Sequence, residues 1–303
     1  MKIYAPDYYN EFSCIADKCK HSCCIGWEID IDDYTLELYK GIGGELGKKL
    51  SDNIVTDKDG VHSFKLCQGE RCPFLNEKGL CQLILEQGED ILCDICNDHP
   101  RYRNFYTDTA EIGLGLCCEA AAEIVVARDK KTEAILLSDD GYEEEPLSDD
   151  EKELFAFKER AISLIQDRNI PYSERADSLY ELRNYNNEEL YYILFPLERL
   201  DNRWDEVLSS LLKDDNKADD YDIVREQLAV YFIFRHLNAE CESYESALAF
   251  ALFSVNVIIK AAKAFYGSSP TVSQIADIAR MYSAEVEYSD CNIQEIMKKL
   301  VCT

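Results

Sequence analysis

The sequence predicts a mostly α-helical protein, in which a cysteine-rich metal-binding domain at residues 1–137 precedes an all-helical bundle at residues 148–303. Two observations lead to this prediction. Eleven of the 14 cysteines lie before residue 119, and helical periodicity dominates after residue 148. The acidic stretch 138–151 between them contains Gly141 and Pro146 but no apolar periodicity, which is typical of a linker. With 47% hydrophobic residues, the 303-residue chain can fill a substantial core.

The N-terminal half has fewer regular elements. Residues 33–50 and 114–134 carry apolar residues at helical spacing, whereas 60–83 and 97–113 are shorter and more loop-like. Because loop-like segments bury little apolar surface, we expect bound metal to supply part of the stability of this domain.

The C-terminal half predicts helices throughout. Ser148 and Glu151 have the spacing of a capping box, so a helix should begin at about residue 148 and end near Asn169, ahead of Pro171. The same periodicity continues with few Gly or Pro residues, which favours a helical bundle. The further predicted helices span 174–199, 202–213, 220–240, 243–266, 271–283 and 292–301.

The overall charge limits the class of partner. Acidic residues outnumber basic ones by 59 to 32, which gives a net charge of −27. Nucleic acid binding requires a positive surface that neutralises phosphates, so we expect no nucleic acid partner. An acidic surface suits a partner that presents lysines, although it also serves simply to keep a protein solvated.

The most apolar run, 249–265, is interrupted by Lys260 and Lys263, each of which costs about 2.5–3.5 kcal/mol at a bilayer centre. We therefore expect a buried core helix and no membrane partner. The N-terminal residues lack the basic and then apolar stretch of a secretory signal, so a cytoplasmic location is expected.

The cysteines form four groups. In a reducing cytoplasm, clustered cysteines favour metal binding over disulfides. Zinc sites usually show two spaced pairs, whereas an iron–sulfur cluster accepts irregular spacing because its ligands converge on a larger object. An iron–sulfur cluster is the leading interpretation, with zinc and unligated thiols as alternatives. The groups are Cys14-x4-Cys19-x3-Cys23-Cys24, Cys72 with Cys81, Cys93-x2-Cys96, and Cys117-Cys118.

Four linked motifs resemble the flagellin lysine N-methylase (FliB-type) family, which has a cysteine-rich zinc- or iron-chelating N-terminal domain. The resemblance is specific over about the first 125 residues and looser beyond, at Tyr231-x3-Arg235-His236. The motifs are Phe12-x-Cys14 with Cys19-x3-Cys23-Cys24-x2-Trp27-x-Ile29, Cys72-Pro-Phe-Leu with Gly79-Leu-Cys81, Leu92-x3-Cys96-x3-Pro100-Arg101, and Leu116-Cys117-x-Glu119-Ala120.

The resemblance implies an S-adenosylmethionine-dependent protein-lysine N-methyltransferase that acts on flagellin, the protein of the bacterial flagellum, and that contains a 4Fe-4S cluster. It also implies a set of metal ligands, while Cys67, Cys93 and Cys118 are additional to the family pattern. The implied ligands are Cys14, Cys19, Cys23, Cys24, Cys72, Cys81, Cys96 and Cys117.

Lysine methylation needs a neutral amine, and therefore a group that accepts its proton. Glu119 is the candidate catalytic residue, although a carboxylate beside a ligand loop also serves to brace it. The glycine-rich stretch 41–47 follows a helical pattern and not a strand, so it is weak evidence for a nucleotide site. Two other classes stay open: a non-enzymatic metal-binding or iron–sulfur protein, and a zinc-stabilised protein-interaction module.

Overall fold

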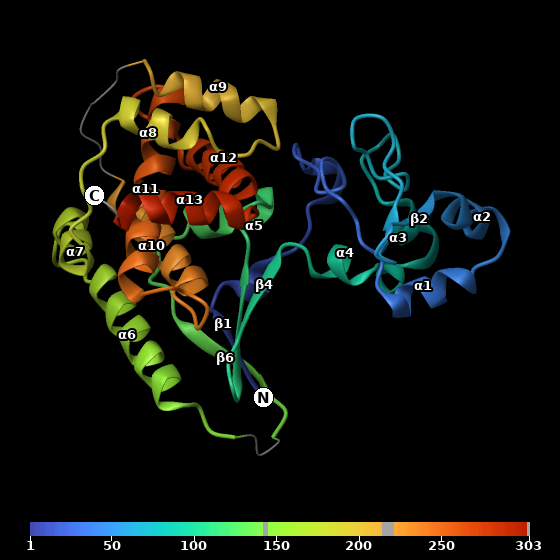
Figure 1. The fold of residues 1–303 in the computed structure, drawn as a ribbon, viewed down its shortest axis with the longest axis horizontal. Helices are drawn as coiled ribbons and strands as arrows, with labels where there is room; N and C mark the ends of the chain where they lie inside the picture. Colours follow the sequence, from blue (N-terminus) through green and yellow to red (C-terminus); the bar gives the residue numbers. More distant parts are fainter. Residues whose placement is uncertain (142–144, 214–220, 302–303) are drawn as a thin grey trace. The chain divides into compact units, whose positions relative to one another are not determined.

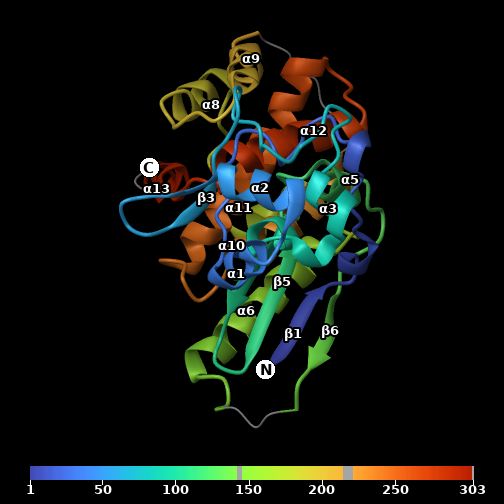
Figure 2. The same ribbon diagram turned by 90° about the vertical axis from the view of Figure 1, so that its right-hand side faces the viewer.

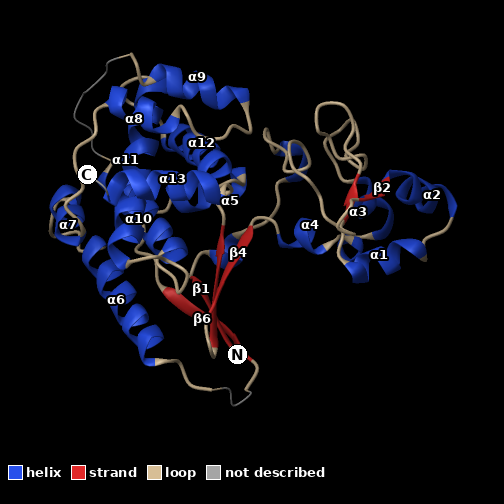
Figure 3. Cartoon of the chain, viewed as in Figure 1, coloured by secondary structure: helices blue, strands red, loops and turns tan. Residues whose placement is uncertain are grey.

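A computed structural model describes residues 1–141, 145–213 and 221–301 (Figure 1). The chain forms two compact units. Unit 1 comprises Met1–Phe12 together with Arg101–Thr303, and unit 2 comprises Ser13–Pro100. Helices, drawn blue in Figure 3, make up most of the regular structure, which confirms the mostly α-helical class.

Unit 1 contains a four-stranded sheet in the order β4-β5-β1-β6, of which β5, β1 and β6 lie side by side in Figure 2. β1 pairs in parallel with β5 and antiparallel with β6, while β4 and β5 form an antiparallel hairpin. The strands span Lys2–Pro6 (β1), Arg101–Phe105 (β4), Thr109–Leu114 (β5) and Ala134–Asp139 (β6).

The helices of unit 1 pack around α11, the 23-residue helix Tyr244–Tyr266, which contacts α9, α10, α12 and α13. Nearly every side chain from Ser246 to Ile259 is buried, as expected for a helix surrounded by others. The other helices are α5 (Glu119–Val126), α6 (Asp149–Ile165), α7 (Tyr172–Leu179), α8 (Asn187–Leu194), α9 (Asn202–Ser210), α10 (Asp222–His236), α12 (Val272–Tyr282) and α13 (Asp290–Val301), with a π-helical turn at Ser283–Glu287.

Helix α11 is long and apolar enough, by length and composition alone, to cross a membrane. In the structure, 78% of its most apolar window is buried inside the protein. This burial confirms the predicted core helix.

Local signals located most helix starts in the C-terminal half. The Ser148 hydroxyl accepts from the Glu151 backbone N–H and the Glu151 carboxylate accepts from Ser148, so the predicted capping box is present. Asn186 and Thr271 cap α8 and α12 in the same reciprocal way. The predicted helix 174–199 is instead two helices, α7 and α8, separated by an extended stretch.

Unit 2 is built from short elements around a small core of its own. Phe64, Phe74 and Tyr39 lie at its centre, with the Phe64 and Phe74 ring centroids 4.9 Å apart. Its elements are α1 (Asp33–Lys40), α2 (Gly44–Asn53), α3 (Gln82–Gln87), α4 (Asp94–Asp98) and the hairpin of β2 (Ile54–Thr56) with β3 (His62–Phe64).

The predicted helix 33–50 is in fact two helices. Gly44 has φ +71°, a left-handed conformation that glycine adopts without strain, and it turns the chain between α1 and α2. The glycine-rich stretch 41–47 therefore joins two helices and does not follow a strand, as the sequence indicated.

The predicted helix 114–134 is wrong over much of its length. Leu114 ends β5, Glu119–Val126 is helical, and Ala134 begins β6. The apolar residues near both ends of this segment serve strand pairing and core packing, which helical spacing alone does not distinguish.

The two units also divide the chain elsewhere than at the linker expected near residue 138. Unit 2 is an insertion after Phe12 that ends at Pro100. The physical reason is the pairing of β1 with β5 and β6, which ties the first six residues to residues 109–139. Composition carries no signal for such long-range pairing.

A buried ion pair joins the sheet of unit 1 to α6. Lys158 Nζ donates to Glu111 Oε2 at 2.6 Å, and the Tyr106 hydroxyl donates to the same oxygen at 2.8 Å. The ammonium also lies 5.5–5.7 Å from the ring centroids of Tyr106, Phe155 and Phe234. Burial lowers the pKa of Lys158, and the Glu111 carboxylate opposes this shift.

Removing one partner of this pair should destabilise unit 1 strongly. Glu111→Leu strands the Lys158 ammonium in a low-dielectric site, and we expect it to lower the free energy of unfolding by about 3–5 kcal/mol. The double variant Glu111→Leu/Lys158→Met should recover most of that loss. Urea unfolding followed by helical circular dichroism measures both, and equal losses in the single and double variants would contradict the assignment.

Candidate functional site

The first cysteine group lies on an irregular loop of unit 2. The Cys14 sulfur accepts from the Ala16 backbone N–H at 3.4 Å, and Cys19 donates to the His21 carbonyl at 3.3 Å. Cys14 and Cys23 are exposed. Cys24 instead packs against the core of unit 2, and its carbonyl accepts from the Cys72 backbone N–H at 2.8 Å.

Short backbone hydrogen bonds position the later cysteines against the same core. Leu75 pairs with Cys81 in an isolated bridge, which folds the Cys72–Cys81 segment back on itself. Cys93 precedes α4, where its carbonyl accepts from the Cys96 backbone N–H at 3.0 Å. Five thiols thereby share one hydrophobic cluster. They are Cys24, Cys72, Cys81, Cys93 and Cys96.

The Asp32 carboxylate holds α4 to the start of α1. It accepts from the Thr35 backbone N–H at 2.8 Å as the cap of α1, and from the Asp94 backbone N–H at 3.0 Å. Although burial opposes it, these hydrogen bonds keep the pKa of Asp32 below its usual value. One carboxylate thus fixes the position of the Cys93–Cys96 turn.

The clustered thiols perturb one another. Burial, with smaller contributions from nearby Cys24 and Cys81, raises the pKa of Cys72 to about 12. A hydrogen bond from Cys23 lowers the pKa of Cys24 to about 7, and Arg71 assists. A hydrogen bond between Cys93 and Cys96 lowers the pKa of Cys93 and raises that of Cys96. Closely spaced thiols thus change one another's affinity for protons.

The donor chemistry fits a thiophilic metal. Within residues 1–141, 145–213 and 221–301, no three His, Cys, Asp or Glu side chains already stand in the arrangement of a bound ion. The five thiols are nevertheless gathered on one core, and sulfur donors select iron–sulfur clusters and zinc. In the same core cluster, the buried hydroxyl of Tyr39 has no hydrogen-bond partner among the described residues.

Of the eight cysteines that the sequence indicates as ligands, seven belong to unit 2 and Cys117 belongs to unit 1. Within unit 2, Cys24, Cys72, Cys81 and Cys96 share the core cluster, whereas Cys14, Cys19 and Cys23 lie on the loop before it. Two further residues lie in the same core cluster as these four thiols. They are Cys93, which the family pattern lacks, and Tyr39, which no sequence signal indicated.

Cys117 contributes to a second buried polar site, in unit 1. Its thiol hydrogen-bonds with Tyr288, and burial raises its pKa to about 12. The neighbouring Leu116 backbone N–H donates to the Tyr231 hydroxyl at 3.3 Å. The two motifs noted at Leu116–Ala120 and Tyr231–His236 therefore meet in space.

Glu287 is the centre of this site. Its carboxylate accepts from the Tyr231 hydroxyl at 3.1 Å and bonds His236 Nε2 at 2.7 Å, and Arg235 Nε lies 3.4 Å away. Although burial alone would raise the pKa of Glu287, the Arg235 charge and the His236 hydrogen bond keep it low. We name these four residues, Tyr231, Arg235, His236 and Glu287, the Glu287 network. Sequence reasoning missed Glu287 because its place in a π-helical turn carries no motif.

Aromatic rings enclose the Arg235 guanidinium, whose central carbon lies 4.8 Å from the Tyr102 ring centroid and 5.1 Å from that of Tyr288. Tyr102 lies across Gly113, its partner in the β4–β5 hairpin, where any Cβ would fall 2.3 Å from the Tyr102 hydroxyl. Glycine at 113 is therefore what lets Tyr102 reach Arg235.

Glu119 is the first residue of α5 and is half-buried. A carboxylate in the first turn of a helix interacts favourably with the helix dipole. The position at the start of α5 is therefore enough to account for a carboxylate at residue 119. The catalytic role of Glu119 stays a prediction.

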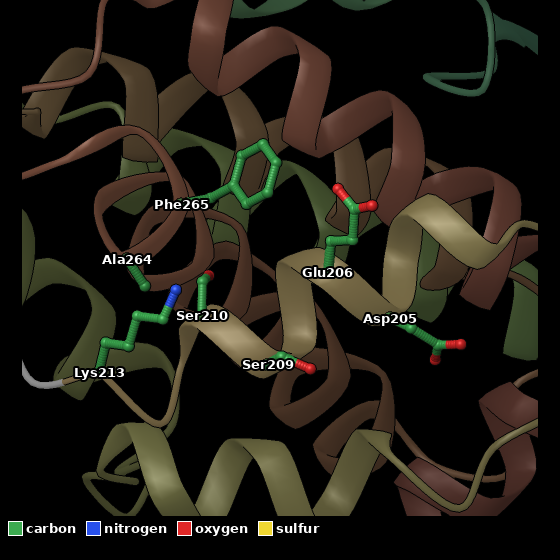
Figure 4. A pocket seen from close by; sticks show the side chains of 7 residues that line it. All are labelled: Asp205, Glu206, Ser209, Ser210, Lys213, Ala264 and Phe265. Atoms are coloured by element: carbon green, nitrogen blue, oxygen red, sulfur yellow. The ribbon is translucent and has the colours of Figure 1, made fainter.

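Unit 1 also has an open cavity of about 500 Å³ between α9 and the end of α11 (Figure 4). The Glu206 carboxylate and the Phe265 ring lie along it. No candidate residue from the sequence lines this cavity. Its lining residues are Asp205, Glu206, Ser209, Ser210, Lys213, Ala264 and Phe265.

Comparison with known proteins gives the family. The chain is 30% identical over 123 residues to the flagellar biosynthetic protein FliU of Salmonella muenchen, and the match covers 39% of this chain and 73% of FliU. The chain belongs to the FliB-type family. Two further members, the lysine-N-methylases of Salmonella typhimurium and Salmonella choleraesuis, are each 28% identical over 123 residues.

The match to the two lysine-N-methylases of the FliB-type family covers 39% of this chain but only 31% of each methylase. No family model matches the chain, and no solved structure matches it.

The Glu287 network predicts a pH-dependent stability. Burial lowers the pKa of His236 below 6.5, so the folded state binds fewer protons than the unfolded state as the pH falls through about 6.5. Stability should therefore decrease on acidification from pH 7 to 5. His236→Gln retains a hydrogen-bond donor without titrating and should show a shallower decrease in urea unfolding across this range. Equal slopes in both proteins would refute this account.

Proposed function

We propose that this chain transfers a methyl group from S-adenosylmethionine to the side-chain nitrogen of lysines on flagellin. The observation that carries the proposal is the 28% identity to two lysine-N-methylases over 123 residues, in a chain whose cysteines gather on one core. The flagellar name of FliU favours flagellin as the substrate. The net charge of −27 suits a substrate that presents lysines.

We further propose that unit 2 holds a 4Fe-4S cluster. Cys24, Cys72, Cys81 and Cys96 supply the four thiolates that such a cluster takes, and each also belongs to the set implied by the family resemblance. When bound, an iron–sulfur cluster supplies Lewis-acidic iron and a store for one electron. The chain's own contribution is the apolar core behind the thiols, which limits water access and tunes such a centre.

In the methyl transfer, the lysine nitrogen attacks the methyl carbon, the bond between that carbon and the sulfonium sulfur breaks, and S-adenosylhomocysteine leaves. The amine is nucleophilic only after it has lost its proton. We propose Glu119 as the group that accepts this proton, because it is a half-buried carboxylate at the start of α5.

Purified chain, loaded with iron and sulfide without oxygen, should methylate flagellin in the presence of S-adenosylmethionine. Mass spectrometry of flagellin peptides should show added methyl groups on lysines, and none when S-adenosylmethionine is left out. A chain with intact metal that never modifies flagellin would overturn the proposed reaction and favour a non-enzymatic iron–sulfur protein. A colourless protein with stoichiometric zinc would favour an interaction module.

The role of Glu119 can be tested separately. Glu119→Gln removes the proton acceptor and should slow methyl transfer by about 10²–10⁴-fold, the usual contribution of general base catalysis. Glu123→Gln, on the same helix, is the matched control and should retain the wild-type rate. Equal rates of methyl transfer in the two variants would refute the role of Glu119 as proton acceptor.

A further inference from the structure

The side chain of Tyr39 is buried in the core of unit 2. It is 3% exposed, and its ring stacks on Phe64 at a centroid distance of 5.9 Å. Among the described residues, its hydroxyl has no hydrogen-bond partner. A buried hydroxyl without a partner is costly, and phenylalanine would fill the same space without that cost. An acceptor from outside the described residues would remove that cost.

The neighbours of this hydroxyl indicate what the acceptor is. Cys93, Cys96 and Cys81 all act on it electrostatically, and Cys93 and Cys96 also hydrogen-bond to each other. These side chains and Tyr39 belong to the same core cluster. Metal binding deprotonates cysteine thiols. A negatively charged sulfur would then be the hydrogen-bond acceptor next to the Tyr39 hydroxyl.

Cys93 has the environment of a ligand and not of a surface thiol. It is fully buried, directly precedes α4, and receives backbone hydrogen bonds at its carbonyl from Cys96 and Asn97, both at 3.0 Å. Asp32 fixes this turn through the Asp94 backbone N–H. Cys67, by contrast, is exposed and outside the core cluster.

We propose that Cys93 is a ligand of the metal centre in unit 2, beside Cys24, Cys72, Cys81 and Cys96, and that the Tyr39 hydroxyl donates a hydrogen bond to a sulfur of that centre. The inference rests on the metal centre of the proposed function and adds two residues to it. A 4Fe-4S cluster takes four thiolates, and the proposal places Cys93 among those four. Hydrogen bonds to sulfur are among the factors that set the stability and potential of such centres.

The Tyr39 test uses metal retention as its readout. The full chain is compared with Tyr39→Phe, which removes only the hydroxyl, and with Tyr34→Phe, a change at an 80% exposed position on the same helix. Each protein is loaded with iron and sulfide, and loss of the visible absorption is followed after addition of a chelator. Tyr39→Phe should lose metal about tenfold faster than wild type, in line with the usual effect of such outer partners. Tyr34→Phe should match wild type. Equal rates in all three proteins would overturn the role of Tyr39.

The Cys93 test compares Cys93→Ala and Cys93→Ser with Cys67→Ser. Iron and zinc per chain are measured after loading, and circular dichroism checks that each variant is folded. Both folded Cys93 variants should bind less metal and show altered absorption, and Cys67→Ser should match wild type. Wild-type metal content in either folded Cys93 variant would refute its ligand role, as would a wild-type chain that binds neither iron nor zinc.

These outcomes separate the inference from the proposed function. A wild-type chain that binds metal but leaves flagellin unmodified refutes the methyl transfer, while the metal readouts still decide Tyr39 and Cys93. A chain that methylates flagellin, with variants that keep wild-type metal content and retention, refutes the inference alone.

Discussion

The pairing of β1 with β5 is the constraint on which the rest of the fold depends. It places Lys2 opposite Thr109 and Tyr4 opposite Glu111, so the chain must leave unit 1 after residue 12 and return to it by residue 101. The exit and return points are held together inside unit 1. Arg101 Nε donates to the Tyr9 hydroxyl at 2.9 Å, and its guanidinium carbon lies 5.4 Å from the Phe12 ring centroid. Unit 2 can then fold as an insertion, because long insertions between fixed ends cost little extra loop entropy.

The two units differ in the chemistry of their buried polar side chains. In unit 1, buried charges find partners within the chain: Lys158 pairs with Glu111, and Arg235 and His236 share Glu287. Such pairs hold the sheet, α6, α10 and the π-helical turn in one arrangement. Other buried polar atoms of unit 1, such as the Tyr102 hydroxyl, have no hydrogen-bond partner among the described residues. In unit 2, five thiols gather on one core, and the neighbouring Tyr39 hydroxyl has no hydrogen-bond partner among the described residues. The gathered thiols are the basis for proposing a metal centre in unit 2.

The family relationship and the structure support different parts of the functional proposal. The match to FliU covers most of that protein, whereas the match to the methylases covers 31% of their length. The proposal of methyl transfer therefore rests on the names of these relatives. The location of the thiols, the Glu287 network and the unpaired Tyr39 hydroxyl come from this chain's own side chains.

The sequence by itself determined what depends on neighbours along the chain. The capping box at Ser148 and Glu151, the buried apolar run of α11 and the spacing of the cysteines are local, and each could be read directly. Only the tertiary structure decided that residues 114–134 contribute to two strands as well as a helix, that Cys117 belongs to unit 1, and that Leu116 meets Tyr231. The partners of Glu287 and the burial of Tyr39 among the thiols are likewise visible only in the tertiary structure. Strand pairing and buried polar contacts join residues far apart in sequence, and no local pattern encodes which partner each residue will meet.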